Sequence, residues 1–121
     1  MSATYTVPGR KWCNLNGSHG NHHAHQSLMD EWQANALRAI HAAGCQAVPE
    51  PVVIIATVRR TRNGRADAHN VTPTIKACID AAVTAELISD DHDGIVHALT
   101  IKAGPKAPAP TVEIEIRPVA S

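Results

Sequence analysis

Four of the six aspartates of this chain lie in two short segments. Asp67 stands in the first segment, and Asp90, Asp91 and Asp93 stand in the second, about one helix length later. Carboxylates placed close together repel one another unless a cation sits between them, and oxygen-rich clusters suit Mg²⁺ or Mn²⁺. A metal held in this way activates water and stabilises charge on a phosphate under attack. The two segments therefore form a candidate metal site, and a structural acidic turn is the alternative for residues 90–94.

Arginines lie shortly before Asp67, at positions Arg59, Arg60, Arg62 and Arg65. The planar guanidinium group donates paired hydrogen bonds to phosphate oxygens. A phosphate-binding segment beside a metal site is the arrangement that nuclease chemistry needs. The alternative is a charged strand end that faces water, as most charge runs do.

Histidines crowd the segment from residue 9 to 26, at positions His19, His22, His23 and His25. Neutral imidazoles can ligate zinc, but neither a cysteine pair nor a regular Cys₂His₂ spacing accompanies them. We therefore expect a flexible, histidine-rich loop over 9–26, whose length suggests a function or mobility. A histidine-rich metal-binding or interaction protein unrelated to DNA stays open as an alternative.

The composition limits the class of protein. Basic and acidic residues balance at 11 each, so charge placement matters more than net charge. With two Trp, one Tyr and no Phe, base stacking is not expected to be the main way of holding nucleic acid. The three cysteines lack a CxxC spacing, which favours a reducing cytoplasm. We see no membrane-span pattern, no signal-peptide pattern and no nucleotide-binding fingerprint, and expect a soluble cytoplasmic protein without a nucleotide cofactor.

The apolar pattern of the sequence predicts the elements that position these residues. We expect one α+β domain over residues 1–121, with a mixed sheet and two helices in the order β-α-β-α-β-β. The expected strands cover 3–7, 52–58, 95–101 and 112–116, and the expected helices run from an N-cap at Ser27 to a stop at Gly44 and from a cap at Thr72 to near Leu87. Trp32 falls on the apolar stripe of the first helix and is expected in the core.

The strand over 52–58 is apolar throughout, which is typical of a central strand buried on both faces. It leads through the arginines to Asp67, whereas the acids of 90–93 lead directly into the next strand. If these two strands are neighbours, the two acidic segments could meet at one end of the sheet.

The run Arg65-Ala66-Asp67-Ala68-His69-Asn70, followed by Lys76, Asp80 and Asp90-Asp91, resembles the motif of RusA-type crossover junction endodeoxyribonucleases. That motif has Asp-x-Asp-Asn, then a Lys and an Asp on the following helix, and an Asp-Asp pair after the helix. The resemblance is strongest over 59–96 and extends more weakly to the first and last strands.

The resemblance implies a homodimeric, Mg²⁺-dependent endonuclease that cuts symmetrically placed bonds across a four-way DNA (Holliday) junction. Such enzymes act in the cytoplasm of bacteria or phage-infected cells. Asp67, Asp90 and Asp91 would bind the metal, Lys76 would contact the scissile phosphate, and Asn70 would orient the motif loop. The arginines would hold flanking phosphates.

Two positions depart from the motif. His69 stands where the family has its second Asp, which removes one negative charge from the metal site and favours Mn²⁺ relative to Mg²⁺. Five residues separate Asn70 from Lys76, in the longer Asn-x-x-Pro-Thr-x-Lys form that we associate with phage members. His69 keeps a second alternative open, a junction-binding protein that has the fold and little or no catalysis.

Overall fold

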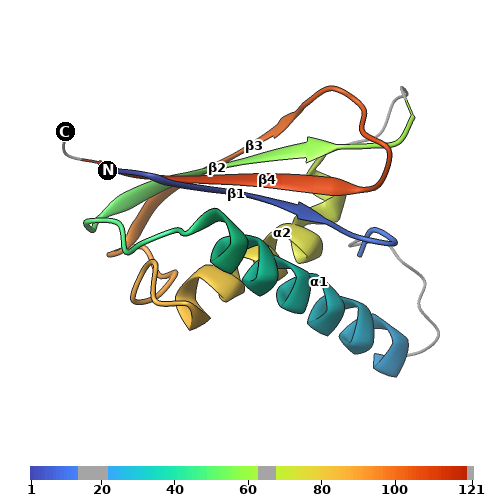
Figure 1. Cartoon of the computed structure of the whole chain (residues 1–121), viewed down its shortest axis with the longest axis horizontal. Helices are drawn as coiled ribbons and strands as arrows, with labels where there is room; N and C mark the ends of the chain where they lie inside the picture. The colour runs from blue at the N-terminus through green and yellow to red at the C-terminus, as the bar shows by residue number, and fades with distance from the viewer. Residues whose placement is uncertain (14–21, 63–67, 120–121) are drawn as a thin grey trace.

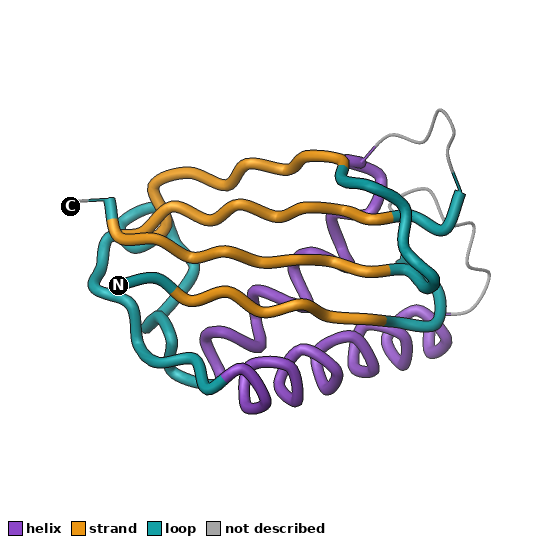
Figure 2. The backbone as a smooth tube through the Cα atoms, turned by 45° about the horizontal axis from the view of Figure 1, so that its top comes forward, coloured by secondary structure: helices purple, strands orange, loops and turns teal. Residues whose placement is uncertain are grey.

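The computed structural model describes residues 1–13, 22–62 and 68–119. One four-stranded sheet carries two helices on one of its faces (Figures 1 and 2). The elements in chain order are β1 (Ala3–Pro8), α1 (His22–Ala43), β2 (Val52–Arg59), the 3-10 helix η1 (Ala68–Val71), α2 (Thr72–Thr84), β3 (Val96–Ala103) and β4 (Thr111–Pro118). This confirms the expected α+β class and element order. In the described part of the chain, neither helix has the length and apolar character needed to cross a membrane.

The strand order is β1-β4-β2-β3. β4 pairs antiparallel with both β1 and β2, and β3 pairs parallel with β2. β1, β2 and β3 therefore all run in one direction, as the arrows of β1 and β2 show in Figure 1. We call the edge where these three strands finish the carboxyl end of the sheet, and the edge where they start the amino end.

The core lies between the sheet and the helices. Every second residue of β2 is buried, including Ile54 and Ala56, whereas Val53 and Ile55 on the opposite face are only half-buried. The expectation that β2 is buried on both faces is therefore wrong, because both helices cover the same face. The side of α1 that faces the sheet buries Trp32, as expected.

α2 is also fixed by polar contacts within the core. The buried hydroxyl of Tyr5 on β1 donates a hydrogen bond to the backbone oxygen of Cys78 in α2, at 2.8 Å. Burial raises the pKa of the Tyr5 phenol above its ordinary value, so that hydroxyl keeps its proton. The hydroxyl of Thr74 donates to the carbonyl of Cys13 and accepts from the Cys13 amide. These bonds attach the segment after β1 to the first turn of α2.

The helix boundaries differ from expectation. α1 begins at His22, so Ser27 lies inside the helix and is not its N-cap, and residues 22–26 are not loop. Its first turn is polar and needs no apolar periodicity, which is why the apolar pattern marked only the later, buried part. Residues 14–21 of the expected loop, with His19, lie outside the described residues.

α2 also starts and stops differently. Thr72 is the first residue of α2 and Val71 takes the cap position, because η1 leads directly into the helix. The helix stops at Thr84, before Glu86 with its left-handed φ of 62°. Leu87 is nevertheless buried, since its amide donates back to the Ala82 carbonyl and its side chain reaches the core. The buried Leu87 fits the apolar stripe of α2, which is why the helix was predicted to end three residues too late.

Candidate functional site

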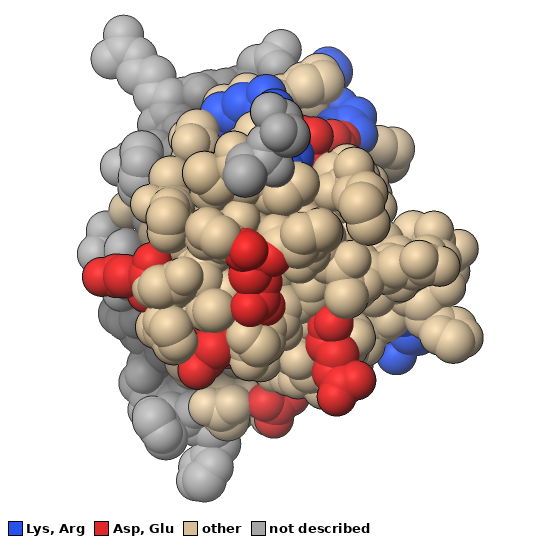
Figure 3. Space-filling model, turned by 90° about the vertical axis from the view of Figure 1, so that its left-hand side faces the viewer, with Lys and Arg blue, Asp and Glu red and all other residues tan. Residues whose placement is uncertain are grey.

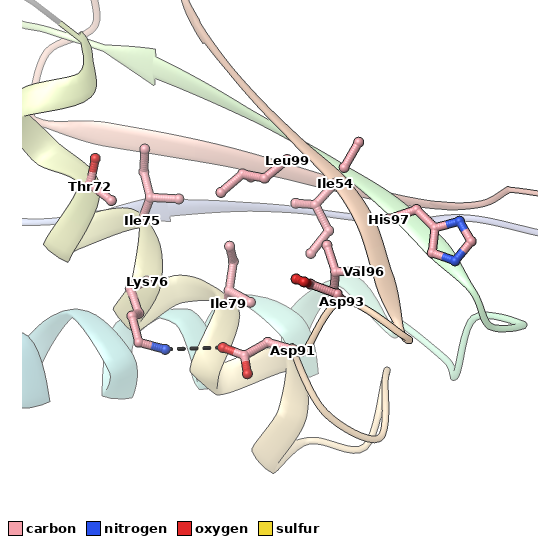
Figure 4. Close-up of a pocket in the computed structure, with 11 residues that line it drawn as sticks. Ile54, Thr72, Ile75, Lys76, Ile79, Asp91, Asp93, Val96, His97 and Leu99 are labelled. Atoms are coloured by element: carbon pink, nitrogen blue, oxygen red, sulfur yellow. Dashed lines mark hydrogen bonds and ion pairs between the residues drawn. The ribbon is translucent and has the colours of Figure 1, made fainter.

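A pocket of about 330 Å³ opens between α2 and β3. Neither helix covers most of β3, and Leu99 on this strand is 42% exposed. The apolar floor contains Ile54, Ile75 and Ile79, and polar side chains stand around it (Figure 4). The polar lining residues are Thr72, Lys76, Asp91, Asp93 and His97. Pockets with an apolar floor and a few convergent polar groups are typical of binding sites.

Lys76 is the central charge of this pocket. It lies in the second turn of α2, and its Nζ is 3.0 Å from Asp91 Oδ2 in the segment before β3. The same Nζ is 3.3 Å from Asp80 Oδ1, one helical turn later. Asp90 Oδ1 accepts a 2.8 Å hydrogen bond from the Asp91 amide, which shapes the turn. Lys76 thus contacts two other motif positions, and the Asp90 side chain holds the backbone of one of them.

The ion pair changes the proton affinity of both partners. The hydrogen bond from Lys76 lowers the pKa of Asp91 below its ordinary value, against a smaller opposing effect of desolvation. The same bond raises the pKa of Lys76. Both groups therefore remain charged across the neutral range. The pair is partly open to water, with side chains 57% and 36% exposed, so a competing ligand can reach either partner.

The two strand ends next to the acidic segments do not lie at the same end of the sheet, and Asp67 itself lies outside the described residues. β2 and β3 are neighbours, but they are parallel, so the finish of β2 and the start of β3 lie at opposite ends of the sheet. α2 connects these ends instead. In Figure 4 the pocket extends from Thr72 at the start of α2 to Asp91 and Asp93 before β3. The pocket thus runs alongside α2, the element that follows the predicted motif loop.

The predicted metal ligands are only partly described. Asp67 and Arg65 lie outside the described residues, and so does the side chain of His69. Among described residues, no three His, Cys, Asp or Glu side chains converge as a metal-binding group. Asp91 and Asp93 both line the pocket, and carboxylate oxygens are the donors that Mg²⁺ and Mn²⁺ prefer. The donor chemistry at this position therefore fits a hard divalent cation.

The described arginines occupy three different environments. Arg59 is tied down: its Nη1 is 3.0 Å from Glu113, and its Nε donates to the Pro105 carbonyl at 3.1 Å. Arg60 lies over the ring of Trp12, with Cζ 5.5 Å from the ring centroid. Arg62 is exposed. Arg59 therefore mainly holds the β3–β4 connection in place, and Arg60 and Arg62 are better placed to contact a ligand. Asn70 lies in η1, immediately before α2.

Two ionisable residues that line the pocket, Asp93 and His97, have no counterpart in the family motif. Asp93 was grouped with the acidic turn, but the family motif covers only the Asp pair before it. His97 lies on β3 where the pairing with β2 shifts register, between the pairs Val52–Val96 and Val53–Ala98, and its ring points away from Leu99 (Figure 4). Because the irregularity interrupts the alternation, no simple strand pattern could have placed His97 at the pocket.

One histidine of the segment over 9–26 makes a described contact with a cysteine. His25 Nδ1 in α1 is 3.4 Å from the Sγ of the buried Cys13. Desolvation raises the pKa of this thiol, which favours its neutral form. This is a pair of groups and not a zinc-ligand set, and the remaining histidines of the segment add no described side chain to it.

The chain was compared with known protein families and with curated protein sequences. No protein-family model matches the chain, and no curated protein sequence matches it. The resemblance to RusA-type endonucleases therefore stays a prediction from the motif residues.

Proposed function

We propose that this chain is a metal-dependent endonuclease that cuts branched DNA such as a four-way junction. The observation that carries the proposal is the 3.0 Å contact between Lys76 Nζ and Asp91 Oδ2. These residues come from separate parts of the motif, and they meet at a pocket that also contains Asp93. A purely structural surface ion pair would need neither the pocket nor the further carboxylate.

Carboxylates of the two acidic segments would hold the metal. Asp91 would bind the metal, with Asp67, Asp90 and His69 as its proposed companions. When bound, Mg²⁺ or Mn²⁺ supplies an activated water nucleophile and positive charge opposite the phosphate. Asp91 is accessible for this role because its side chain is 36% exposed.

Lys76 has a role that its own contacts define. Its ammonium group neutralises Asp91 in the free protein. A phosphate oxygen entering the pocket competes with Asp91 for this ammonium group, since both are anionic acceptors. Asp80, at 3.3 Å, keeps Nζ near the pocket when Asp91 turns to another partner. Lys76 then stabilises the negative charge that develops on the phosphate oxygens during attack.

A homodimer would present two such pockets related by two-fold symmetry, which matches the symmetry of a four-way junction. Two cuts in strands of like polarity would follow from this arrangement. The cytoplasm of a bacterium or of a phage-infected cell is the compartment in which this substrate arises.

The test uses a labelled four-way junction and a linear duplex of the same sequence, each with Mg²⁺, Mn²⁺ or EDTA. We expect metal-dependent, symmetric cuts in the junction alone. Asp91→Asn should abolish these cuts and leave junction binding intact, because it removes the charge and keeps the shape. Asp30→Asn, on the exposed surface of α1, is the matched control and should cut normally.

The other outcomes decide against the proposal. A junction that is bound but uncut with either metal identifies a junction-binding protein without catalysis, the alternative that His69 suggests. A protein that neither binds nor cuts the junction overturns the assignment to DNA altogether.

A further inference from the structure

Basic side chains collect at the carboxyl end of the sheet. They lie on the segments that finish or follow β1, β2 and β3, which share one direction. We call these residues the basic end: Arg10, Lys11, Arg60, Arg62, Lys102 and Lys106. Arg10 pairs with Glu31 at 3.0 Å. Within the described chain, no ion pair forms at Lys11, Arg62, Lys102 or Lys106, so these charges face water.

Backbone hydrogen bonds join these segments into one surface. The Gly9 amide donates to the Pro110 carbonyl at 2.8 Å, which links the segment after β1 to the β3–β4 connection. The Ala107 amide donates to the Arg60 carbonyl at 2.9 Å, which links the same connection to the end of β2. Positive charges from three distant parts of the sequence therefore lie on one continuous, braced end of the domain.

An aromatic stack stands within this surface. Trp12 lies parallel to the buried Trp32, with ring centroids 5.7 Å apart and an interplanar angle of 15°. Trp32 Nε1 donates to the Lys11 carbonyl at 2.8 Å, which fixes the backbone beside Trp12. The half-buried Trp12 also carries the Arg60 guanidinium over its ring. The Trp12–Arg60 pair is thus held in place from the core.

The opposite end of the sheet has the opposite charge. Acidic side chains spread across the amino end, and Lys and Arg side chains lie at its margins (Figure 3). The described acids of this region include Glu50, Glu86, Asp90, Asp91 and Asp93. Without a bound cation at Asp91, a polyanion is attracted to the basic end more than to this end.

We propose that the basic end binds an unpaired nucleotide, whose base stacks on the Arg60 guanidinium that Trp12 supports, while Lys11, Arg62 and Lys106 hold the neighbouring phosphates. Unpaired bases are commonly held by aromatic rings and arginine planes set in a positive groove. The proposal rests on the proposed function for the identity of the ligand as DNA. It adds a contact to the open centre of a branched substrate, separate from the Lys76–Asp91 pocket.

Binding without cutting tests this surface alone. Single-stranded oligothymidylate is titrated into the full chain in EDTA and low salt, and fluorescence anisotropy of the labelled DNA gives the affinity. Arg60→Gln and Trp12→Ala should each weaken binding about 5- to 100-fold, the range found for single stacking contacts. Intrinsic fluorescence should also be quenched on binding, because Trp12 and Trp32 are the two tryptophans of the chain.

Arg38→Gln is the matched control, because Arg38 lies on α1 outside the basic end and bonds to Asn35. It should bind as the unaltered chain does. Thermal melting shows whether Trp12→Ala folds, and Arg60→Gln decides the question if it does not. Unchanged affinity in Arg60→Gln, or an equal loss in Arg38→Gln, overturns the proposal.

The two proposals can fail separately. If binding to oligothymidylate depends on Arg60 but the junction is not cut in Mg²⁺ or Mn²⁺, the proposal for the basic end is supported and the proposed nuclease activity is rejected. If the junction is cut and neither Arg60→Gln nor Trp12→Ala changes binding or cutting, the proposed nuclease activity is supported and the proposed stacking surface is rejected.

Discussion

The amino and carboxyl ends of the sheet are built differently. At the amino end, acidic groups order the turns: Glu50 accepts hydrogen bonds from both the amide and the hydroxyl of Ser89, and Asp90 accepts one from the Asp91 amide. At the carboxyl end, backbone bonds and stacked rings brace a surface of exposed positive charge. A net charge of zero therefore describes neither end. The candidate pocket lies between them, alongside α2.

The first prediction tests whether cutting and binding depend on different parts of the molecule. It concerns Lys76, the cation that faces the acidic segment. Lys76→Gln should lower the rate of junction cutting about 100- to 1000-fold, as expected when one donor to a developing oxyanion is removed. Junction affinity in EDTA should stay unchanged, because binding is expected to depend on the basic end. Single-turnover cutting of a labelled junction gives the rate.

Arg117→Gln is the control for the Lys76 variant. It also removes one positive charge, from the end of β4 that lies at the amino end of the sheet. Its cutting rate should equal that of the unaltered chain. Wild-type cutting by Lys76→Gln would rule out the role given to this side chain.

The next prediction concerns the packing of the carboxyl end, where Gly9 lies against the ring of Trp32. A Cβ atom here would overlap the ring of Trp32, so Gly9→Ala should lower the free energy of unfolding by about 1–3 kcal/mol. It should also disturb the near-ultraviolet circular dichroism of the stacked tryptophans. Urea unfolding measures the first effect.

Gly94→Ala is the corresponding substitution at the amino end, and its effect on stability is compared with that of Gly9→Ala. There the nearest atoms to an added Cβ belong to the side chain of His92, which can swing aside. Its cost should be smaller than that of Gly9→Ala. Equal urea midpoints for Gly9→Ala and the unaltered chain would show that the Trp32 contact tolerates a side chain.

The smallest expected effect concerns acid stability. Lys76 lowers the pKa of Asp91 in the folded chain, so the pair stabilises the fold above the ordinary Asp pKa and loses this contribution as pH falls through the lowered value. Because both side chains are exposed, the contribution is at most about 1 kcal/mol. Carboxyl NMR titration should show the Asp91 pKa rising in Lys76→Gln, and an unchanged pKa would argue against the ion pair.

Much of the fold follows from local patterns in the sequence. Apolar residues at helical or alternating spacing predicted both helices and all four strands in the right order. The run over 52–58 could not show which faces of β2 are covered, because that depends on where the helices pack. The place of β4 between β1 and β2 was also not predicted, since strand order depends on contacts between distant segments.

The candidate site was predictable to a similar extent. The motif placed Lys76 and Asp91 together, and the structure brings them into contact. A strand–helix–strand connection between neighbours normally makes the strands parallel, so the finish of β2 and the start of β3 lie at opposite ends of the sheet. Asp67 lies outside the described residues, and its meeting with Asp90 and Asp91 stays a prediction. The Trp12–Arg60 contact spans 48 positions without a repeat or motif, so no local pattern could reveal it.

The position of β4 has a consequence for how the chain is made. This strand, over residues 111–118, supplies the hydrogen-bond partners for both β1 and one edge of β2. A growing chain on the ribosome that has not yet released it holds β1 and β2 without their shared neighbour. The sheet can therefore close only after β4 emerges, and contacts between residues so far apart in sequence favour slow assembly. Until then, the exposed strand edges depend on dilution or chaperones to avoid pairing with other chains.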